Sequence, residues 1–418
     1  MSIYKHSVTL DISKCKGCTN CIKRCPTEAI RVRNGHAVIK EERCIDCGEC
    51  IRVCPYQAKK ATFDKFEDFA SYKYKIALPA PALFGQFEDL DDVDYILTAL
   101  MKCNFDAVFE VSRAAELITE YTRAYMKREG LEYPVISSAC PAIVRLINLR
   151  FPYLVDNLLP IMPPIEYAAR LARKEALEKN PELTNDDICV LFISPCPAKI
   201  SYIKYPLGTE KSAVTGGLAI SDVYFKLRSK RKEIKAPESI AQTGIIGLNW
   251  AGSGGEATSL LSDKYLAADG IENCIKVLDE IENGTLHTLE FVELNACIGG
   301  CVGGTLNVEN PFIAKARLRS LRKYLPISMN RLSDNEIAST NDKVMWDEQI
   351  SDNTVDTLSD DRMTAILKMS EIEKIYKDLP HLDCGSCGAP NCHALAEDII
   401  KGEANYEDCL IRLRDKQN

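Results

Sequence analysis

The sequence lacks an amino-terminal stretch in which basic residues precede an apolar run, which is the pattern of a secretory signal peptide. It also lacks any apolar run approaching the roughly 18 residues that a membrane-spanning helix needs. These two absences argue against a membrane partner, and we expect a cytoplasmic protein. In that compartment thiols stay reduced, so cysteines indicate metal binding or catalysis rather than disulfides.

An excess of positive charge is also missing, because the formal net charge is −8. Binding to phosphates requires an extensive basic face. The densest basic stretch, "KLRSKRKEIK", is short enough to be a solvated helix end or loop. We therefore expect no nucleic-acid partner.

Cysteine, in contrast, is abundant, with 19 residues in a chain of 418. Eight cysteines fall within 15–54, four within 384–409, and seven lie between these groups. This distribution predicts a two-cluster ferredoxin-like domain over 1–71, a central domain over 72–330, a polar linker or wrapping segment over 331–361, and a C-terminal 4Fe-4S module over 362–418. The central part alternates strand-like and helical stretches, which favours an α/β domain with mostly parallel sheets.

The N-terminal cysteines form an internal repeat. "CKGCTNCIKRCP" at 15–26 and "CIDCGECIRVCP" at 44–55 both have the spacing C-x2-C-x2-C-x3-C-P. This is the ferredoxin run in which three cysteines bind one 4Fe-4S cluster and the fourth binds the other. The predicted sets are Cys15, Cys18, Cys21 and Cys54 for one cluster, and Cys44, Cys47, Cys50 and Cys25 for the other. The alternatives are a pair of zinc sites and a structural thiol cluster.

Three central cysteines each follow a strand-like run: Cys140 after "PVISSA", Cys196 after "ICVLFISP" and Cys297 after "EFVELNA". Ligands of open α/β sheets bind at the carboxyl ends of the strands, so these cysteines could converge on one site. Cys301 brings the number to four, which a further 4Fe-4S cluster requires. The alternative is four unrelated buried cysteines.

The stretches "SSACP", "SPCPAK" and "ELNACIGGCVGG" resemble the three signature segments of the iron-only (FeFe) hydrogenases. The resemblance covers roughly residues 72–330 and implies two twisted, mostly parallel sheets flanked by helices. It implies an H-cluster, a 4Fe-4S cluster joined to a two-iron subcluster with CO, CN and a bridging dithiolate. The ligands would be Cys140, Cys196, Cys297 and Cys301, with Cys301 also bridging to the subcluster. Lys199 matches the family lysine that hydrogen-bonds a cyanide.

The chain departs from the pattern of fast family members at three positions. Ala139 stands where those members have a proton-relaying cysteine, and alanine has no exchangeable proton. Ser194 and Asn295 stand where methionines line the subcluster, which should change hydrogen bonding to the cofactor. Glu116 and Glu120 are candidates for the relay glutamates by proximity only, and we interpret both as parts of a solvated helix face.

The C-terminal cysteines, Cys384, Cys387, Cys392 and Cys409, have the spacing C-x2-C-x4-C-x16-C. This resembles a small 4Fe-4S module of corrinoid iron-sulfur proteins and sensory hydrogenases. Zinc is the alternative, with His393 or His381 replacing a thiolate. Cys103, Cys189 and Cys274 remain as expected buried core residues. The glycine-rich "NWAGSGGEATSLL" lacks the lysine of a P-loop and the spacing of a dinucleotide fingerprint.

The departures resemble the sensory branch of the family, although no segment is long enough for the PAS domain that many sensory members carry. We predict a slow hydrogenase that senses H2 or redox state. The alternatives are a working hydrogenase with another proton path, through Ser137, Ser138 or water, and an iron-sulfur scaffold that never receives the subcluster. The expected partners are a redox protein such as ferredoxin or a signalling protein, and the hydrogenase maturation proteins. A homodimer is left open.

Overall fold

The computed structural model describes residues 6–340, 343–350, 358–359 and 361–417. Its contacts group the chain into two compact units, one of Met1–Ala61 with Asp352–Asn418 and one of Thr62–Ser351. The four-part division drawn from the sequence stays a prediction. Of its segment 331–361, residues 341–342, 351–357 and 360 lie outside the described residues, whereas Val344 is fully buried in the core of the second unit.

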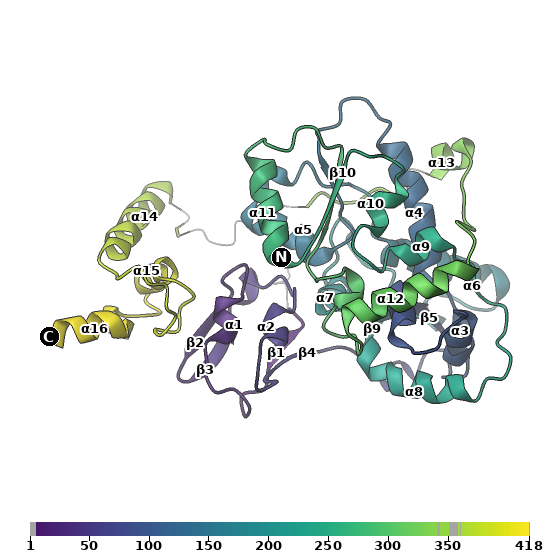
Figure 1. The fold of residues 1–418 in the computed structure, drawn as a ribbon, viewed down its shortest axis with the longest axis horizontal. Helices are drawn as coiled ribbons and strands as arrows, with labels where there is room; N and C mark the ends of the chain where they lie inside the picture. The colour runs from purple at the N-terminus through teal and green to yellow at the C-terminus, as the bar shows by residue number, and fades with distance from the viewer. Residues whose placement is uncertain (1–5, 341–342, 351–357, 360, 418) are drawn as a thin grey trace. The chain divides into compact units, whose positions relative to one another are not determined.

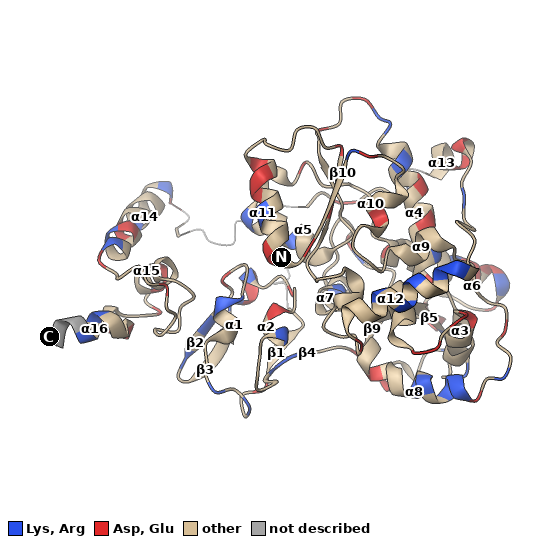
Figure 2. Ribbon diagram, viewed as in Figure 1, with Lys and Arg blue, Asp and Glu red and all other residues tan. Residues whose placement is uncertain are grey.

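The second unit contains a four-stranded parallel sheet in the order β6 (Ala107–Val108), β5 (Tyr74–Pro79), β8 (Ile188–Ser194) and β9 (Gly216–Ala219) (Figure 1). Its main helices are α3 (Asp94–Met101), α4 (Val111–Tyr125), α5 (Pro141–Arg150), α6 (Pro164–Lys179), α7 (Pro197–Lys204), α8 (Ile220–Lys232), α9 (Ile245–Asn249), α10 (Gly255–Ser259), α11 (Ile271–Glu282), α12 (Pro311–Leu321) and α13 (Asp334–Thr340). Charged residues of both signs are spread over these helices, with many Lys and Arg on α8 and α12 (Figure 2).

Both faces of this sheet are buried, which explains the continuous apolar run of β8. On β5, Ile76 and Leu78 pack in one cluster with residues of α4 and α6, whereas Ala77 packs in the other with residues of α3 and α12. A three-stranded parallel sheet, β10 (Tyr265–Asp269), β11 (Phe291–Asn295) and β7 (Val135–Ile136), completes the unit. The expected α/β architecture with parallel sheets flanked by helices is confirmed.

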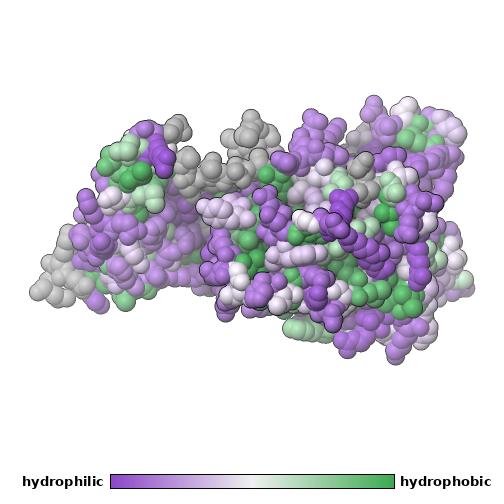
Figure 3. Space-filling model, turned by 90° about the horizontal axis from the view of Figure 1, so that it is seen from above, coloured by the Kyte–Doolittle hydropathy of each residue, from purple (hydrophilic) through white to green (hydrophobic). Residues whose placement is uncertain are grey.

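The first unit contains two antiparallel strand pairs, β1 (Val8–Leu10) with β4 (Lys59–Ala61) and β2 (Ile30–Arg33) with β3 (His36–Ile39). Each cysteine repeat adds one short helix, α1 (Asn20–Lys23) or α2 (Glu49–Arg52). The C-terminal residues form α14 (Arg362–Lys377), α15 (Cys392–Ile400) and α16 (Leu410–Gln417). Apolar side chains are exposed on α14, among them Met363, Ile366 and Leu367, and hydrophobic residues show there in Figure 3.

A buried carboxylate connects the C-terminal helices to the N-terminal hairpin of this unit. Asp398 on α15 has no exposed side-chain surface and accepts from Arg31 Nε at 2.6 Å, Arg33 Nη2 at 2.6 Å and Lys40 Nζ at 3.0 Å. Beside it, the Val32 amide donates to the Gly388 carbonyl oxygen at 2.8 Å. A Cβ at Gly388 would lie 2.1 Å from the Val32 oxygen, so the close approach requires glycine. Within the part of the chain that the structure describes, no helix is long and apolar enough to cross a membrane.

Candidate functional site

Two central cysteines lie where a parallel strand gives way to a helix. Cys140 is the N-cap of α5 and Cys196 is the N-cap of α7, and in both cases the next residue is a proline at the first helical position. Proline fits there because its missing N–H would have no helical partner. A thiolate at a helix N-terminus is stabilised by the positive end of the helix dipole. The strand-end positions predicted from the sequence therefore place both cysteines at the N-terminus of a helix.

The other two cysteines lie in the glycine-rich loop after β11. Gly300 has a φ of +87°, and a Cβ on it would lie 2.4 Å from the Ser253 amide nitrogen. A Cβ on Gly304 would lie 2.2 Å from the Pro195 carbonyl oxygen and 3.3 Å from the Cβ of Cys196. Glycine at these positions lets the loop of Cys301 pack directly against the end of β8. These glycines thus allow the segment "ELNACIGGCVGG" to pack against the segment "SPCPAK".

Lys199 marks the point on which the four cysteines converge. Its Nζ contacts the Cys301 sulfur at 3.6 Å. Burial alone would lower the pKa of this lysine. The negative charges of the four thiolates outweigh burial and raise the pKa well above its ordinary value, with the largest effect from Cys301, followed by Cys196, Cys140 and Cys297. Burial also raises the pKa of Cys196 to about 11, against the opposing charge of Lys199. The predicted ligands and the predicted lysine are brought together in one site.

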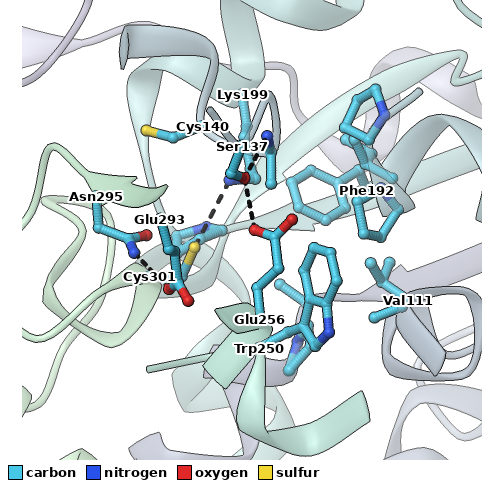
Figure 4. Close-up of a pocket in the computed structure, with 18 of the residues that line it drawn as sticks. Val111, Ser137, Cys140, Phe192, Lys199, Trp250, Glu256, Glu293, Asn295 and Cys301 are labelled. Carbon is cyan, nitrogen blue, oxygen red and sulfur yellow. Dashed lines mark hydrogen bonds between the residues drawn. The ribbon is translucent and has the colours of Figure 1, made fainter. Parts of the chain in front are cut away.

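The site opens into a cavity of about 60 Å³. Figure 4 shows apolar side chains, including Val111, Phe192 and Trp250, on one side and Cys140, Cys301 and Asn295 on the other. The predicted relay position Ala139 lines this cavity, as does the predicted substitution Asn295. A thiolate-lined chamber with one buried ammonium and a dry apolar wall is chemically suited to an anionic metal cofactor.

Ser194 differs from the expectation that it faces the cofactor. Its side chain is fully buried and is absent from the residues that line the cavity. The hydroxyl donates to the Cys196 carbonyl oxygen at 2.9 Å and accepts from the Cys196 amide at 3.3 Å. A short hydroxyl side chain at the end of β8 reaches the nearest backbone groups, so Ser194 shapes the turn that carries Cys196.

Two buried glutamates on the cavity wall were not identified from the sequence. Ser137, two residues before Ala139, donates from its Oγ to Glu256 Oε2 at 2.5 Å and accepts from the Ala139 amide at 3.2 Å. Burial, followed by the charge of Glu293, raises the pKa of Glu256 to about 8, whereas Ser137 and Lys199 oppose this rise. A proton-holding group with a pKa near neutrality therefore lies beside Ala139, the predicted relay position.

The second glutamate, Glu293, explains the glycine-rich stretch at 249–261. Its carboxylate accepts from the Gly254 amide at 2.9 Å, the Ala257 amide at 2.8 Å and Asn295 Nδ2 at 2.8 Å. The backbone donors at the start of α10 are thus used by a carboxylate of the chain itself. Burial raises the pKa of Glu293, while these hydrogen bonds oppose the rise. A charged residue inside the buried run "FVEL" is the sequence signal that could have revealed it.

The prediction of a solvated helix face is wrong for Glu116. This residue is 1% exposed, and its carboxylate accepts from the amides of Gly244, Met329 and Asn330 at 2.7 to 3.0 Å. Glu120, one turn later, is partly exposed and pairs with Arg123 at 2.6 Å. Neither glutamate lines the cavity. Cys103, Cys189 and Cys274 are buried, as expected.

The N-terminal cysteines fall into the two sets that the repeat predicts. One cavity is lined by Cys15, Cys18, Cys21 and Cys54, and another by Cys25, Cys44, Cys47 and Cys50. His6, whose spacing in the sequence suggests no ligand, lies with Cys44 and Asp46 in a group whose ligand atoms are within 4.8 Å of one another. The Asp46 carboxylate accepts from the amides of Ser7 and Val8 at 3.0 Å.

Three of the four C-terminal cysteines approach one another, since the charges of Cys409 and Cys384 both act on Cys387. Burial is the main cause that raises the pKa of Cys387. The alternative zinc ligand His393 directs Nδ1 toward Glu397 at 3.4 Å, and its ring packs edge-on against Tyr376. The ring of His381 packs on the same tyrosine. Both histidine rings are thus engaged with side chains other than the cysteines.

Comparison with known proteins gives three family matches. The model described as "Iron only hydrogenase large subunit, C-terminal domain" matches residues 73–214 and 204–305, which is more than half of the chain. A "4Fe-4S dicluster domain" matches residues 7–55, and a "Putative Fe-S cluster" domain matches residues 379–411. The three matches cover the three groups of cysteines.

Two curated relatives are similar over most of the chain. The periplasmic Fe hydrogenase large subunit of Nitratidesulfovibrio vulgaris is 25% identical over 78% of this chain and 92% of its own length. Iron hydrogenase 1 of Clostridium pasteurianum is 24% identical over 76% of this chain and 68% of its own. A solved variant of FeFe-hydrogenase HydA1 from Chlamydomonas reinhardtii shares the fold, with a TM-score of 0.51 and 16% identity over 68% of this chain and 96% of that one.

Proposed function

The chain belongs to the iron-only hydrogenase family, and from that premise we propose that it holds an H-cluster and interconverts protons, electrons and H2 slowly, as a sensor of H2 or redox state. The observation that carries the proposal is the place of Ala139. It lines the cavity directly before Cys140, where a thiol would have to stand to pass protons to and from the cofactor. Loss of such a group costs roughly 10²–10⁴ in rate.

Four cysteines would hold the iron-sulfur part of the cofactor: Cys140, Cys196, Cys297 and Cys301. The fit is supported by Lys199, because its buried ammonium lies among the four cysteine sulfurs, 3.6 Å from that of Cys301, and so offers a positive charge to an anionic iron-sulfur group. When bound, the H-cluster supplies the redox site at which H2 is split or formed. Lys199 would donate a charge-assisted hydrogen bond toward the two-iron part and hold it in one orientation.

Ser137 and Glu256 are the groups that could hold a proton beside Ala139. The serine hydroxyl donates to Glu256, so the two side chains form a hydrogen-bonded pair. Because the pKa of Glu256 is about 8, the side chain can both release and accept a proton near neutral pH. This arrangement supports slow turnover, and it also supports the second candidate function, a working hydrogenase that uses this pair as its proton path.

Hydrogen uptake and evolution by the loaded full-length protein separate the two candidates. Rates well below those of ordinary family hydrogenases are expected, whereas comparable rates would exclude the slow sensory function. Infrared bands of bound CO and CN are expected after maturation in a competent host. Their absence, with iron still present in the clusters, would leave the third candidate, an iron-sulfur scaffold without the two-iron subcluster.

The chain's partners follow from this function and are part of the proposal. Electrons would be exchanged with a redox protein such as ferredoxin or with a signalling protein, and the two-iron part would be delivered by hydrogenase maturation proteins. The cytoplasm remains the predicted location. One relative is named as periplasmic.

A further inference from the structure

Lys59 in the first unit is a buried lysine. It lies on β4 opposite Leu10, is 2% exposed, and among the residues that the structure describes its Nζ has no hydrogen-bond partner. The next residue, Lys60, points the other way, as alternation along a strand requires. Lys60 is exposed and lies 3.3 Å from the Asp11 carboxylate. The strand thus carries one lysine in water and one inside the domain.

The surroundings of Lys59 are cysteines of both N-terminal sets. It lines the cavity formed by Cys15, Cys18, Cys21 and Cys54. Burial raises the pKa of Cys21 to about 11, and the charge of Lys59 opposes that rise. In the other set, burial raises the pKa of Cys50 to about 12, and the charge of Lys59 again opposes the rise. One ammonium group is therefore within electrostatic reach of thiolates from both sets.

A buried ammonium without a counter-charge is strongly unfavourable, because it loses its hydration and gains no partner. Two thiolate-bound 4Fe-4S clusters would provide the missing negative charge. Each one-electron reduction adds a further negative charge to a cluster. A fixed positive charge nearby favours the reduced form, and in a dry interior this effect is little screened by salt.

We propose that Lys59 sets the reduction potentials of the two N-terminal clusters by placing one buried positive charge between them. It raises both potentials, and it acts more strongly on the cluster of Cys15, Cys18, Cys21 and Cys54, whose cavity it lines. Lys59 is a positioning residue for electron transfer and touches no substrate. The inference goes beyond the proposed function, since it holds whether or not the central site receives its two-iron part.

The test is a redox titration of the full chain, followed by EPR of the reduced clusters, for Lys59→Met and Lys60→Met. Both variants lose one positive charge from the same strand. Lys59→Met should shift the midpoint potentials to more negative values. At a fixed potential, the ratio of oxidised to reduced cluster should rise about tenfold, which for one electron corresponds to a shift of about 59 mV. Lys60→Met should leave them unchanged. Equal potentials in Lys59→Met and the unchanged protein, or equal shifts in the two variants, would overturn the proposal.

Lys59→Arg separates charge from packing. It keeps the positive charge, so its potentials should stay near those of the unchanged protein, and a shift as large as that of Lys59→Met would overturn the proposal. Iron content is measured for each variant. If Lys59→Met fails to hold iron while Lys59→Arg holds it, the charge is required for cluster binding itself, which supports the proposal. Loss of iron in both would assign Lys59 to packing and overturn it.

Discussion

At the scale of single residues, the chemistry of this chain depends on what stands beside the cysteine ligands. Ala139 lines the cavity at the predicted relay position, and Ser137 and Glu256 place a hydroxyl and a carboxyl group next to it. Lys199 contributes the positive charge that balances the thiolates. Each of these residues changes either a proton position or a charge, so each can be tested by one substitution.

Ala139→Cys should raise H2 turnover by about tenfold or more, because it restores an exchangeable proton at the inner end of the path. The measurement is H2 uptake and evolution by the loaded protein. Ala139→Val is the matched control, since it adds similar volume without a proton and should give no gain. An unchanged rate in Ala139→Cys would mean that Asn295 or the outer part of the path limits turnover.

Glu256→Gln should lower H2 turnover by roughly 10²–10⁴-fold, because the amide cannot accept a proton. In the unchanged protein, H2 oxidation should rise as the pH increases through about 8, where the Glu256 carboxylate becomes available. Glu293 and Lys199 also face this carboxyl group and act on its pKa in opposite directions. Glu290→Gln removes a partly exposed charge paired with Lys264 and serves as the control. Full activity and an unchanged pH profile in Glu256→Gln would exclude this proton path.

At the scale of elements, the cavity depends on loops that a few buried carboxylates hold in place. Glu293 holds the start of α10, and Glu116 on α4 holds the backbone at Gly244 and at 328–330. Backbone amides in buried loops need acceptors, and no strand or helix supplies them at these positions. The strand-to-helix junctions therefore position Cys140 and Cys196, while side-chain carboxylates position loops around the cavity.

Glu116→Ala should destabilise the second unit by on the order of 3 kcal/mol, because several buried donors lose their acceptor at once. Chemical denaturation of the full chain should show a lower midpoint, and hydrogen exchange should increase at 244–247 and 328–330. Glu120→Ala, one turn along the same helix, removes a partly exposed pair with Arg123 and should cost at most about 1 kcal/mol. Equal effects of the two substitutions would contradict the role assigned to Glu116.

At the scale of the whole molecule, residues more than 350 positions apart in sequence meet in the first unit. Asp398 of α15 holds Arg31 and Arg33 of β2, a strand that carries positive charge in Figure 2, together with Lys40. Burial alone would raise the pKa of Asp398, but the hydrogen bond and charge of Arg31, followed by those of Lys40, lower it. The C-terminal cysteine module is thereby attached to the N-terminal cysteine repeat.

Asp398→Asn should weaken this attachment by roughly 3–5 kcal/mol, because Arg31 is left buried without its counter-charge. Limited proteolysis and hydrogen exchange should show faster opening of 362–417. Since the folded pKa lies below the ordinary value of 3.8, the stabilisation in the unchanged protein is complete above that value and is lost as the pH falls through the folded pKa. Glu403→Gln, which removes a half-exposed partner of Lys40, is the control. Equal protease resistance in all three proteins would contradict the prediction.

The sequence by itself determined the cysteine sets and the fold class. Cluster ligands follow one another at fixed short spacings, so the repeats at 15–26 and 44–55 predicted the two groups that line separate cavities. The strand-like runs before Cys140, Cys196 and Cys297 became β7, β8 and β11, because buried parallel strands carry continuous apolar residues. These signals are local, and local spacing is sufficient to read them.

Only the tertiary structure decided which polar side chains face the cavity and which charges are buried. The Ser194 hydroxyl bonds the nearby backbone of Cys196, and the buried Glu116 carboxylate accepts hydrogen bonds from loops that are distant in sequence. Glu256 and Glu293 line the cavity, and of the two neighbouring lysines Lys59 is buried whereas Lys60 is exposed. The physical reason is that burial and pKa depend on segments far away in sequence, which no spacing between neighbours records.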